Sequence, residues 1–587
     1  MDQPIGEHIR QLRRQYSLTQ TELGDERFSK SYVSAVERGK ITPSHDALHF
    51  FAEQLGQSSD YFEQFNQQIG LVPSLFPLPQ PFLPPAGDRD KQEKAFILLD
   101  MLLENAELCC QQLLQRLPVL SSQELATLPA DKQARYSFWR GNIAQEKGNT
   151  STALKAFEYA LALASSKDQP PILDSLGMCH YLAHDYHMAL SYHRRALHIL
   201  EEEAISRTAS TLRLKVQFHC AEDYRTMGAH KQAVVHYESA RHYLNAAHDL
   251  KTASQIYEGL GYCTYASFFQ KEMLLPSSLT ETAIEEAEQA FQHATDLLSH
   301  STTLYQVSND STAESITRLT QAMVLLDLCA QRRYVAQEKR GSIHAPIATN
   351  YATLLDEAKE QCNQVLINGQ TSWLASHGPS TELKATLYLA MAYLIRILVE
   401  QAVLTRHSGY TDKAKHERAR AAFLCQRVLM AFAEQALSWA LIQEIMNMQT
   451  SDGEYQTESL PDLANLSPPS RLPSSTRISQ AELYFAAGAL AEELGDTAMS
   501  AEYIDGQHKQ ADQYFQSALT LLRSALQEQQ SDQSYLTRCY RRYINILEGR
   551  IAIYAVKPKL HMQSLLNVLK DTLLQLQSAS ELPSLEG

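Results

Sequence analysis

The sequence has few of the features that cross-link small or secreted proteins. Its nine cysteines are an odd number, they stand singly except for Cys109 and Cys110, and no CxxC motif occurs. A disulfide framework and a cysteine-based zinc site both need paired or closely spaced cysteines. The cysteine pattern therefore favours reduced thiols packed inside a folded chain.

Long hydrophobic runs are also missing. No apolar stretch approaches the roughly 18 to 20 residues that a membrane span requires. The N-terminus, MDQPIGEHIRQLRRQYS, lacks the apolar core and the small-residue cleavage site of a secretory signal. We therefore expect a protein that makes no membrane contact and stays in the cytoplasm.

Positive charge is scarce, and catalytic signatures are absent. The chain has 52 Lys+Arg against 67 Asp+Glu, a net charge of -15. Phosphate binding needs a cationic footprint, so nucleic acid can contact only a local part of the surface. The sequence contains no Walker loop, GxSxG, HExxH or dinucleotide fingerprint. We expect neither an enzyme nor a bound cofactor.

A helical pattern is present in a chain too long for one core. At roughly 100 to 200 residues per domain, 587 residues predict several domains or an extended repeat array. Near the N-terminus, Ser29 is placed to cap a short helix that ends at Gly39. The apolar positions at helical spacing in this region are Ile5, Ile9 and Leu12, then Val33 and Val36, then Leu48, Phe51 or Ala52, and Leu55.

Five short helices, two of them joined by a tight turn, resemble the lambda-repressor/Cro-like (XRE) helix-turn-helix family. The resemblance rests on IRQLRRQYSLTQTEL and SYVSAVERGKITPS and covers residues 5 to 63. It implies a DNA-binding domain over residues 1–68, in which Glu37 pairs with Arg13. The signature positions are occupied by Leu18, Gln20, Leu23, Val33, Glu37 and Gly39.

The same resemblance implies a set of contacts with double-stranded DNA. Lys30 and Ser31 would reach base edges in the major groove, and Ala35 is the next base-facing position. The implied phosphate contacts come from Gln20, Ser29, Arg38, Gly39 and Lys40. The stretch GDERFSKSYV is one residue shorter than the common family pattern, and Phe28 stands where a turn glycine is frequent.

A second interpretation of this domain stays open, because helix-turn-helix domains also dock onto proteins. Residues 1–65 hold 7 Lys+Arg against 10 Asp+Glu, although all seven cations precede residue 41. A single acidic domain binds DNA weakly, so a dimer is needed to reach the usual specific affinity of roughly 10 nM.

Residues 69–90 are predicted to link this domain to the rest of the chain. The stretch LVPSLFPLPQPFLPPAGDRD contains six prolines, which hold the backbone near polyproline II. The segment is interpreted as a semi-rigid spacer, and binding to an aromatic groove of another protein is the alternative.

Beyond the linker, three stretches align without gaps: GNIAQEKGNTSTALKAFEYALAL, GMCHYLAHDYHMALSYHRRALHI and AEDYRTMGAHKQAVVHYESARHY. At three aligned positions each stretch has a small residue, then an aromatic ring, then another small residue. These residues are Ala153, Phe157 and Ala160; Ala189, His193 and Ala196; and Ala233, Tyr237 and Ala240. Two further units fit when loops are allowed: Gly261 with Ala287, Phe291 and Ala294, and Gly488 with Ala511, Phe515 and Ala518.

Small residues with an aromatic between them are what paired antiparallel helices need at their crossings, and the pattern resembles the tetratricopeptide (TPR) repeat. The predicted fold is all-α, with the helix-turn-helix domain followed by a TPR-like right-handed α-solenoid over residues 91–587. Residues 452–477, rich in Ser and Pro, are predicted to be a disordered insertion.

Histidines crowd the second and third repeats and raise the question of a metal site. His180, His184 and His187 follow helical spacing, and His193 occupies the aromatic core column. No carboxylate or thiolate completes an evident ligand set in the sequence. We therefore predict packing and not metal binding for these histidines.

The first helix of each TPR pair lines the concave face, so its inward positions form a candidate ligand groove. Amide and charged groups interleaved with aromatic rings suit an extended peptide or a protein segment. An ordinary solvated wall is the alternative. The groove positions are Phe138, Asn142, Gln145, Asp174, Met178, Tyr181, Phe218, Glu222, Arg225, Glu258, Tyr262 and Tyr265.

The order of the two parts, helix-turn-helix first and TPR array second, resembles the peptide-responsive RRNPP regulators of Gram-positive bacteria. This resemblance implies a homodimeric, cytoplasmic transcription regulator of the quorum-sensing type, in which a peptide in the repeats changes how the DNA-binding domains are presented. The alternative is a TPR adaptor whose N-terminal domain docks onto a protein and never binds DNA.

Overall fold

The computed structural model describes most of the chain beyond residue 124 and parts of the N-terminal region. Two compact units divide the chain, Met1–Ser175 and Leu176–Gly587, and the division falls within helix α11 (Gln169–Leu182). The predicted boundaries at residues 68 and 90 lie outside the described residues. The described residues are 9–10, 13, 19–24, 27–37, 45–55, 120, 125–202, 207–244, 250–271, 281–338, 345–375, 379–448, 455, 460–461, 466, 472–498, 500–529, 534–553 and 560–580.

Three short helices near the N-terminus pack on one small core. They are α2 (Gln20–Gly24), α3 (Lys30–Glu37) and α4 (His45–Gln54). Helix α3 begins where the sequence predicts, because the Ser29 hydroxyl accepts a hydrogen bond from the Tyr32 amide at 3.2 Å. The predicted fifth helix lies outside the described residues. The buried apolar residues are Ile9, Leu23, Val33, Val36, Ala47, Leu48, Phe51, Ala52 and Leu55.

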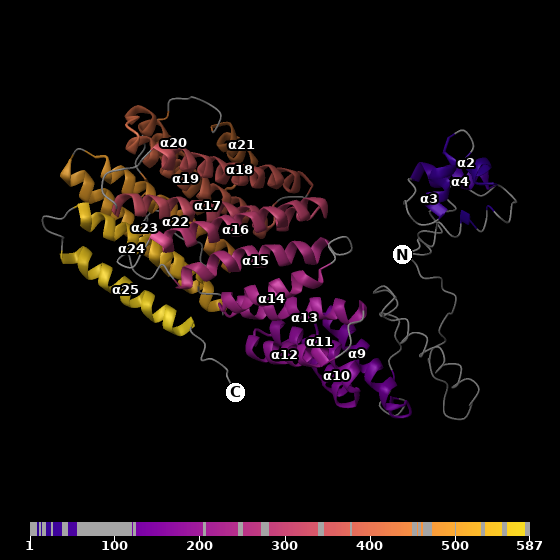
Figure 1. The fold of residues 1–587 in the computed structure, drawn as a ribbon. Helices are drawn as coiled ribbons and strands as arrows, with labels where there is room; N and C mark the ends of the chain where they lie inside the picture. The colour runs from indigo at the N-terminus through magenta and orange to yellow at the C-terminus, as the bar shows by residue number, and fades with distance from the viewer. Residues whose placement is uncertain are drawn as a thin grey trace. The chain divides into compact units, whose positions relative to one another are not determined.

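The remaining helices follow one another in antiparallel pairs, as Figure 1 shows for each unit. The first unit holds α9 (Ala130–Glu146) and α10 (Thr150–Leu163), and α11 runs into the second unit. The second unit continues with α12 (Tyr186–Glu202), α13 (Arg207–Thr226), α14 (His230–Tyr243), α15 (Leu250–Lys271), α16 (Glu281–Val307), α17 (Ser311–Glu338), α18 (Ala345–Ala375), α19 (Thr381–His407), α20 (Thr411–Ala433), α21 (Trp439–Met448), α22 (Ser474–Asp496), α23 (Ala501–Gln529), α24 (Ser534–Ile553) and α25 (Leu560–Ser580). The described residues therefore form an all-α, TPR-like array, and every regular element among them is a helix.

The repeat columns predicted from the sequence are the contact points of the helix pairs. Phe157, His193, Tyr237, Phe291 and Phe515 have no exposed surface, and neither do the alanines on either side of them. A methyl group added at Gly141 would come within 3 Å of the Phe157 ring, and one added at Gly488 would meet the Phe515 ring in the same way. Glycine is required at these two positions because an aromatic ring of the partner helix occupies the space of a side chain.

Several pairs turn back through the same backbone motif. Gly148, His184, Gly228, Asn309 and Gly409 all have positive φ and follow the first helix of a turn. In each case the next amide bonds back to a carbonyl five residues earlier, as Asn149 does to Ala144 at 2.9 Å. This Schellman geometry ends a helix and reverses the chain within a few residues.

Helix α19 lies in the centre of the second unit. By length and composition it is the one helix among the described residues that is apolar enough to span a membrane, but 83% of its most apolar window is buried inside the protein. Long apolar core helices pass the same test. The burial of α19 is therefore explained by packing on α17, α18, α20 and α22.

Two sequence predictions concern the packing of this unit. The insertion predicted to be disordered, 452–477, includes Leu460 and Leu466, which are 6% and 7% exposed. The Tyr514 hydroxyl donates to the Pro461 carbonyl at 2.5 Å, so the chain packs on α23 at these points. The prediction of buried, reduced thiols is confirmed for the described cysteines, which are Cys179, Cys220, Cys263, Cys329, Cys362, Cys425 and Cys539.

Candidate DNA-recognition helix and ligand groove

A buried ion pair joins the first N-terminal helical segment to the end of α3. The Arg13 guanidinium donates to Glu37 through Nε at 2.5 Å and through Nη2 at 3.1 Å. The Glu37 side chain is 1% exposed and the Arg13 side chain 11%. This pairing, implied by the XRE resemblance, is confirmed. It fixes α3 against the preceding helices and so orients the residues at its start.

Gln20 contributes to the same arrangement. Its side-chain amide donates to the Glu37 carboxylate at 2.7 Å. The amide group that the sequence assigns to a DNA phosphate is therefore already bonded inside the domain. Phosphate contact through Gln20 would require this hydrogen bond to be exchanged.

The N-terminal end of α3 carries the candidate base-contacting residues. Lys30 and Ser29 are exposed there, and Ala35, one turn further along, is half-buried. The Ser29 hydroxyl serves as the cap of α3, so its phosphate role competes with capping. The side chain of Ser31, and Arg38, Gly39 and Lys40, lie outside the described residues.

An aromatic cluster fills the turn before α3. The Phe28 ring stacks on Tyr32 at 5.1 Å between centroids and meets Phe50 at 5.4 Å and Phe51 at 5.5 Å. The Arg27 guanidinium lies 5.5 Å from the centroid of the Phe50 ring. Phe28 therefore replaces the turn glycine with a packing anchor, a role that the sequence comparison did not predict.

The groove positions predicted from the sequence lie on the first helices of consecutive pairs, α9, α11, α13 and α15. Most of these side chains are half-buried: Phe138, Asn142, Gln145, Met178, Tyr181, Phe218, Glu222, Arg225, Glu258 and Tyr262. Asp174 and Tyr265 differ, with exposures of 1% and 2%. In this conformation these two residues offer almost no surface to a ligand.

A hydrogen-bonded network occupies the middle of the groove in the second unit. Arg225 donates to Glu222 through Nη2 at 2.5 Å and through Nε at 3.2 Å. The Tyr237 hydroxyl donates to the other oxygen of Glu222, and Tyr181 is bonded to Thr226 at 3.2 Å. Glu222 raises the pKa of Arg225, and burial followed by Glu222 raises the pKa of Tyr237. The network holds Arg225 charged, with its side chain 38% exposed.

Glu258 on α15 interacts with the charges of Arg225 and Glu222. Burial raises its pKa, and the hydrogen bond donated by Tyr305 at 2.8 Å opposes that rise. Glu222, Arg225 and Glu258 thus present one cation and two acids on neighbouring helices. Such a surface can hold the polar groups of a peptide backbone or of its charged side chains.

Tyr265 points into the protein and not into the groove. Its hydroxyl donates to Oδ2 of Asp327 on α17 at 2.5 Å. Burial, and then the Asp327 charge, raise its pKa far above the ordinary value. The groove residues of α15 therefore end at Tyr262, because Tyr265 on the next turn of the helix bonds to α17.

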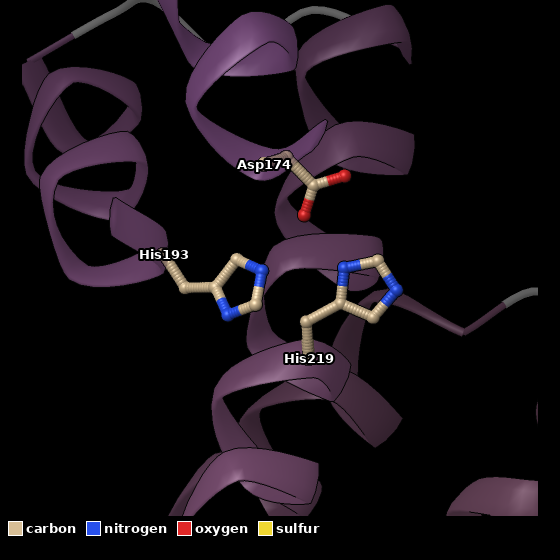
Figure 2. A group of neighbouring side chains, drawn as sticks. All are labelled: Asp174, His193 and His219. Carbon is tan, nitrogen blue, oxygen red and sulfur yellow. The ribbon is translucent and has the colours of Figure 1, made fainter. Parts of the chain in front are cut away.

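His193 of the second repeat lies in a polar, buried environment, whereas His184 and His187, which were also predicted to pack, are exposed. His193 bonds through Nδ1 to Oδ2 of Asp223 at 2.6 Å, and both side chains are fully buried. The His219 ring lies 5.3 Å from the His193 ring, centroid to centroid. Figure 2 shows these two imidazoles with the carboxylate of Asp174 as neighbouring side chains. The sequence predicted the burial of His193 but not its carboxylate partner.

No protein-family model matches the chain, and no curated protein matches it. Among solved structures, PlcR of Bacillus thuringiensis in complex with the peptide PapR7 and DNA is 13% identical over 52% of this chain and 98% of its own, with a TM-score of 0.23. The apo form of RapI is 13% identical over 51% and 99%, with a TM-score of 0.29.

A point mutant of PrgX is 14% identical over 59% of this chain and 98% of its own, with a TM-score of 0.22. TM-scores this low mean that the chains do not superimpose as wholes, and identities this low do not indicate function.

Proposed function

We propose that this chain is a non-enzymatic, DNA-binding transcription regulator whose TPR-like solenoid binds a peptide or protein ligand. The observation that carries the proposal is the setting of α3. Its inner side packs on the N-terminal core, the Arg13–Glu37 pair fixes its end, and Lys30 is exposed at its start. A short helix presented in this way has the form of a major-groove recognition helix.

The ligand half of the proposal is supported by the groove network. Arg225 is held charged yet partly exposed, and the rings of Phe218 on the same helix and of Tyr262 on α15 are half-buried. Charged groups between aromatic rings suit an extended peptide. The charged groups can bind its termini or polar side chains, and the rings can contact its apolar side chains. In the proposed mechanism the ligand favours one arrangement of a homodimer, and that arrangement sets the affinity for the operator.

DNA binding is tested with the purified full chain and a library of duplexes, at low and at moderate salt. We expect Lys30→Ala combined with Arg38→Ala to weaken binding and to lower the dependence of affinity on salt. The matched control is Arg427→Ala, which removes an exposed cation paired with Glu444 on α21. Unchanged binding and salt dependence in the double variant would refute the proposed recognition helix.

The second candidate function is a TPR adaptor that never binds DNA. The acidic balance of residues 1–65, with 7 Lys+Arg against 10 Asp+Glu, favours it. A chain that is not retained by any duplex at low salt, yet binds peptides, would support the adaptor.

Ligand binding is tested by isothermal titration of peptide pools into the full chain. We expect Arg225→Ala and Asn142→Ala to weaken the binding of any peptide that the parent binds. Lys231→Ala, an exposed position on the second helix of the same pair, is the control. Equal binding by all four chains would refute the groove assignment.

A further inference from the structure

A buried cluster of charged side chains lies where the first helices of several pairs meet. Asp327 of α17 and Glu482 of α22 are its acids, and they are 7% and 0% exposed. Its cations are Arg396 of α19 and Arg538 and Arg542 of α24, with exposures of 5%, 3% and 13%. Three guanidinium groups thus face two carboxylates, a surplus of one positive charge.

Each of the two carboxylates accepts three hydrogen bonds. Asp327 accepts from Arg538 at 3.0 Å, from Arg396 at 3.4 Å and from the Tyr265 hydroxyl. Glu482 accepts from Arg538 at 2.8 Å, from Arg542 at 3.4 Å and from the Tyr535 hydroxyl. The arginines lower the pKa of Glu482 to about 2 even though burial acts in the opposite direction. The arginines also lower the pKa of Asp327, so both acids stay charged, and all three arginines already bond to one or both of them.

Several guanidinium nitrogens remain without a hydrogen bond. They are Nη1 of Arg396, Nε of Arg538 and Nη2 of Arg542. The first lies 3.8 Å from Glu482 and the third 3.5 Å from Asp327, close enough for charge attraction only. Rings flank two of the arginines, with Tyr535 at 4.4 Å from Arg538 and Phe485 at 5.0 Å from Arg542. Stacking holds the guanidinium planes but supplies no acceptor.

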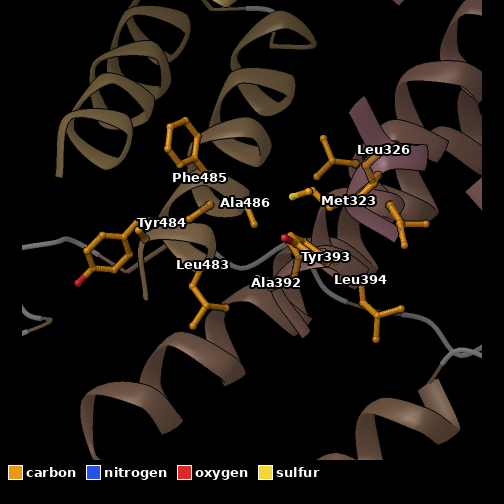
Figure 3. Packing of buried hydrophobic residues seen from close by; sticks show 14 of the residues in the cluster. Met323, Leu326, Ala392, Tyr393, Leu394, Leu483, Tyr484, Phe485 and Ala486 are labelled. Carbon is orange, nitrogen blue, oxygen red and sulfur yellow. The ribbon is translucent and has the colours of Figure 1, made fainter. Parts of the chain in front are cut away.

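The surroundings make the missing acceptor costly. Figure 3 shows buried apolar side chains of α17, α19 and α22, with Met323, Tyr393 and Ala486 close to one another and the Phe485 ring turned away from them. A surplus charge in apolar surroundings is destabilising unless a counter-charge accompanies it.

We propose that the arginine surplus of Arg396, Arg538 and Arg542 is a binding site for one oxyanion, either a carboxylate or a phosphate-type group. Guanidinium edges match the two oxygens of such a group, which would supply acceptors for the nitrogens that Asp327 and Glu482 leave unbonded. Arg542 is the most exposed of the three and marks the side of entry. The site is separate from the recognition helix, so it stands whether or not the chain binds DNA.

The first experiment uses the full chain and inorganic phosphate as the probe. Thermal unfolding is followed by circular dichroism in phosphate and in chloride, at one pH and one ionic strength. We expect the unfolding temperature to rise with phosphate and then to level off, as for a ligand that binds only the folded state. An equal response to both salts would overturn the site, because it would reflect general screening.

Two variants test whether the arginine cluster causes the rise in unfolding temperature with phosphate. Arg542→Gln balances the cluster at two cations and two acids, so the phosphate effect should disappear. Arg427→Gln removes the same charge from an exposed pair and should keep the effect. A full phosphate response in Arg542→Gln would overturn the assignment. If that variant does not fold, equilibrium dialysis of labelled phosphate against the parent decides, with about one phosphate per chain expected and none overturning the site.

The source of the oxyanion is separated by two further probes, acetate and a short peptide with either a free or an amidated C-terminus. A phosphate response without any acetate or peptide response assigns the site to a free oxyanion. Stabilisation by acetate and by the free peptide, but not by its amide, assigns it to a carboxylate terminus. In both cases the response must be lost in Arg542→Gln.

Discussion

The Nδ1 atom of His193 lies 2.6 Å from Oδ2 of Asp223, and neither side chain has any exposed surface. His193 stands in the column that Phe157 and Tyr237 occupy in the neighbouring repeats, so a phenyl ring fits the position. The polar ring is tolerated there because a carboxylate on α13 bonds to it. The second repeat therefore has an imidazole–carboxylate pair in the column where Phe157 places a phenyl ring and Tyr237 a phenol bonded to Glu222.

This pair predicts a double-mutant result. His193→Phe alone should destabilise the fold by roughly 3 to 5 kcal/mol, because it leaves Asp223 buried and unpaired. Adding Asp223→Leu should recover most of that loss, since replacing both partners by apolar groups is nearly neutral. Urea unfolding of both single variants and the double variant measures the coupling. If the losses of unfolding free energy in the two single variants add up in the double variant, the broken His193–Asp223 pair is not the cause of the destabilisation.

The helix crossing between α22 and α23 predicts opposite effects at two glycines. Gly488→Ala should destabilise by roughly 1 to 3 kcal/mol, because the new methyl group would overlap the Phe515 ring. Gly506→Ala, on α23 with no atom within 4 Å of its new methyl, should stabilise by about 0.5 to 1 kcal/mol through helix propensity. Thermal unfolding compares the two, and an equal sign at both positions would contradict the packing explanation.

The pKa of Glu482 predicts how acid weakens the second unit. Its folded value, about 2, lies below the ordinary 4.5, so the carboxylate stabilises the fold fully above pH 4.5. That contribution, on the order of 3 kcal/mol, should be lost as pH falls from 4.5 toward 2. The groups that lower it are Arg542, Arg538 and Arg396, and the Tyr535 hydroxyl also bonds to it.

Urea unfolding between pH 5 and pH 2 measures this loss. Glu482→Gln should be less stable than the parent at pH 5 but should show a shallower decline with acid. Glu444→Gln, in an exposed pair with Arg427, should keep the parent's decline. Parallel curves for parent and Glu482→Gln would contradict the assignment.

The Arg13–Glu37 pair predicts a link between the packing of the N-terminal domain and DNA binding. Glu37→Gln should leave Arg13 largely buried without its counter-charge and destabilise this domain by roughly 3 to 5 kcal/mol. If the proposed function holds, the same variant should weaken DNA binding although it removes no DNA contact. Limited proteolysis of the full chain should show earlier cleavage before residue 56, while unchanged protection would contradict the structural role.

The features that could be predicted from the sequence are those that repeat or that occur close together in the chain. The columns through Phe157 and Phe515 were visible because each repeat places the same residue types at the same helix crossing. Arg13 and Glu37 were paired through the family resemblance. Neither inference required knowledge of contacts between distant repeats.

The features that could not be predicted depend on how far the array curves. Tyr265 was assigned to the groove because it has the right helical spacing on α15. Its hydroxyl instead reaches Asp327, and Asp327 reaches Arg538, which is 211 residues further along the chain. The spacing of residues within one repeat does not predict that α15, α17 and α24 are in contact. That contact depends on the rotation between each helix pair and the next, added over all the pairs between them.

The distance in sequence between Asp327 and Arg538 has a consequence during synthesis. At roughly 5 to 20 residues per second, a ribosome needs on the order of 10 to 40 s to add the 211 residues that separate them. During that interval α17 has emerged while its main cationic partner does not yet exist. Until Arg538 and Arg542 are synthesised, Asp327 of the nascent second unit can pair only with Arg396 among the three arginines of the cluster, so the cluster is completed late in the synthesis of this unit.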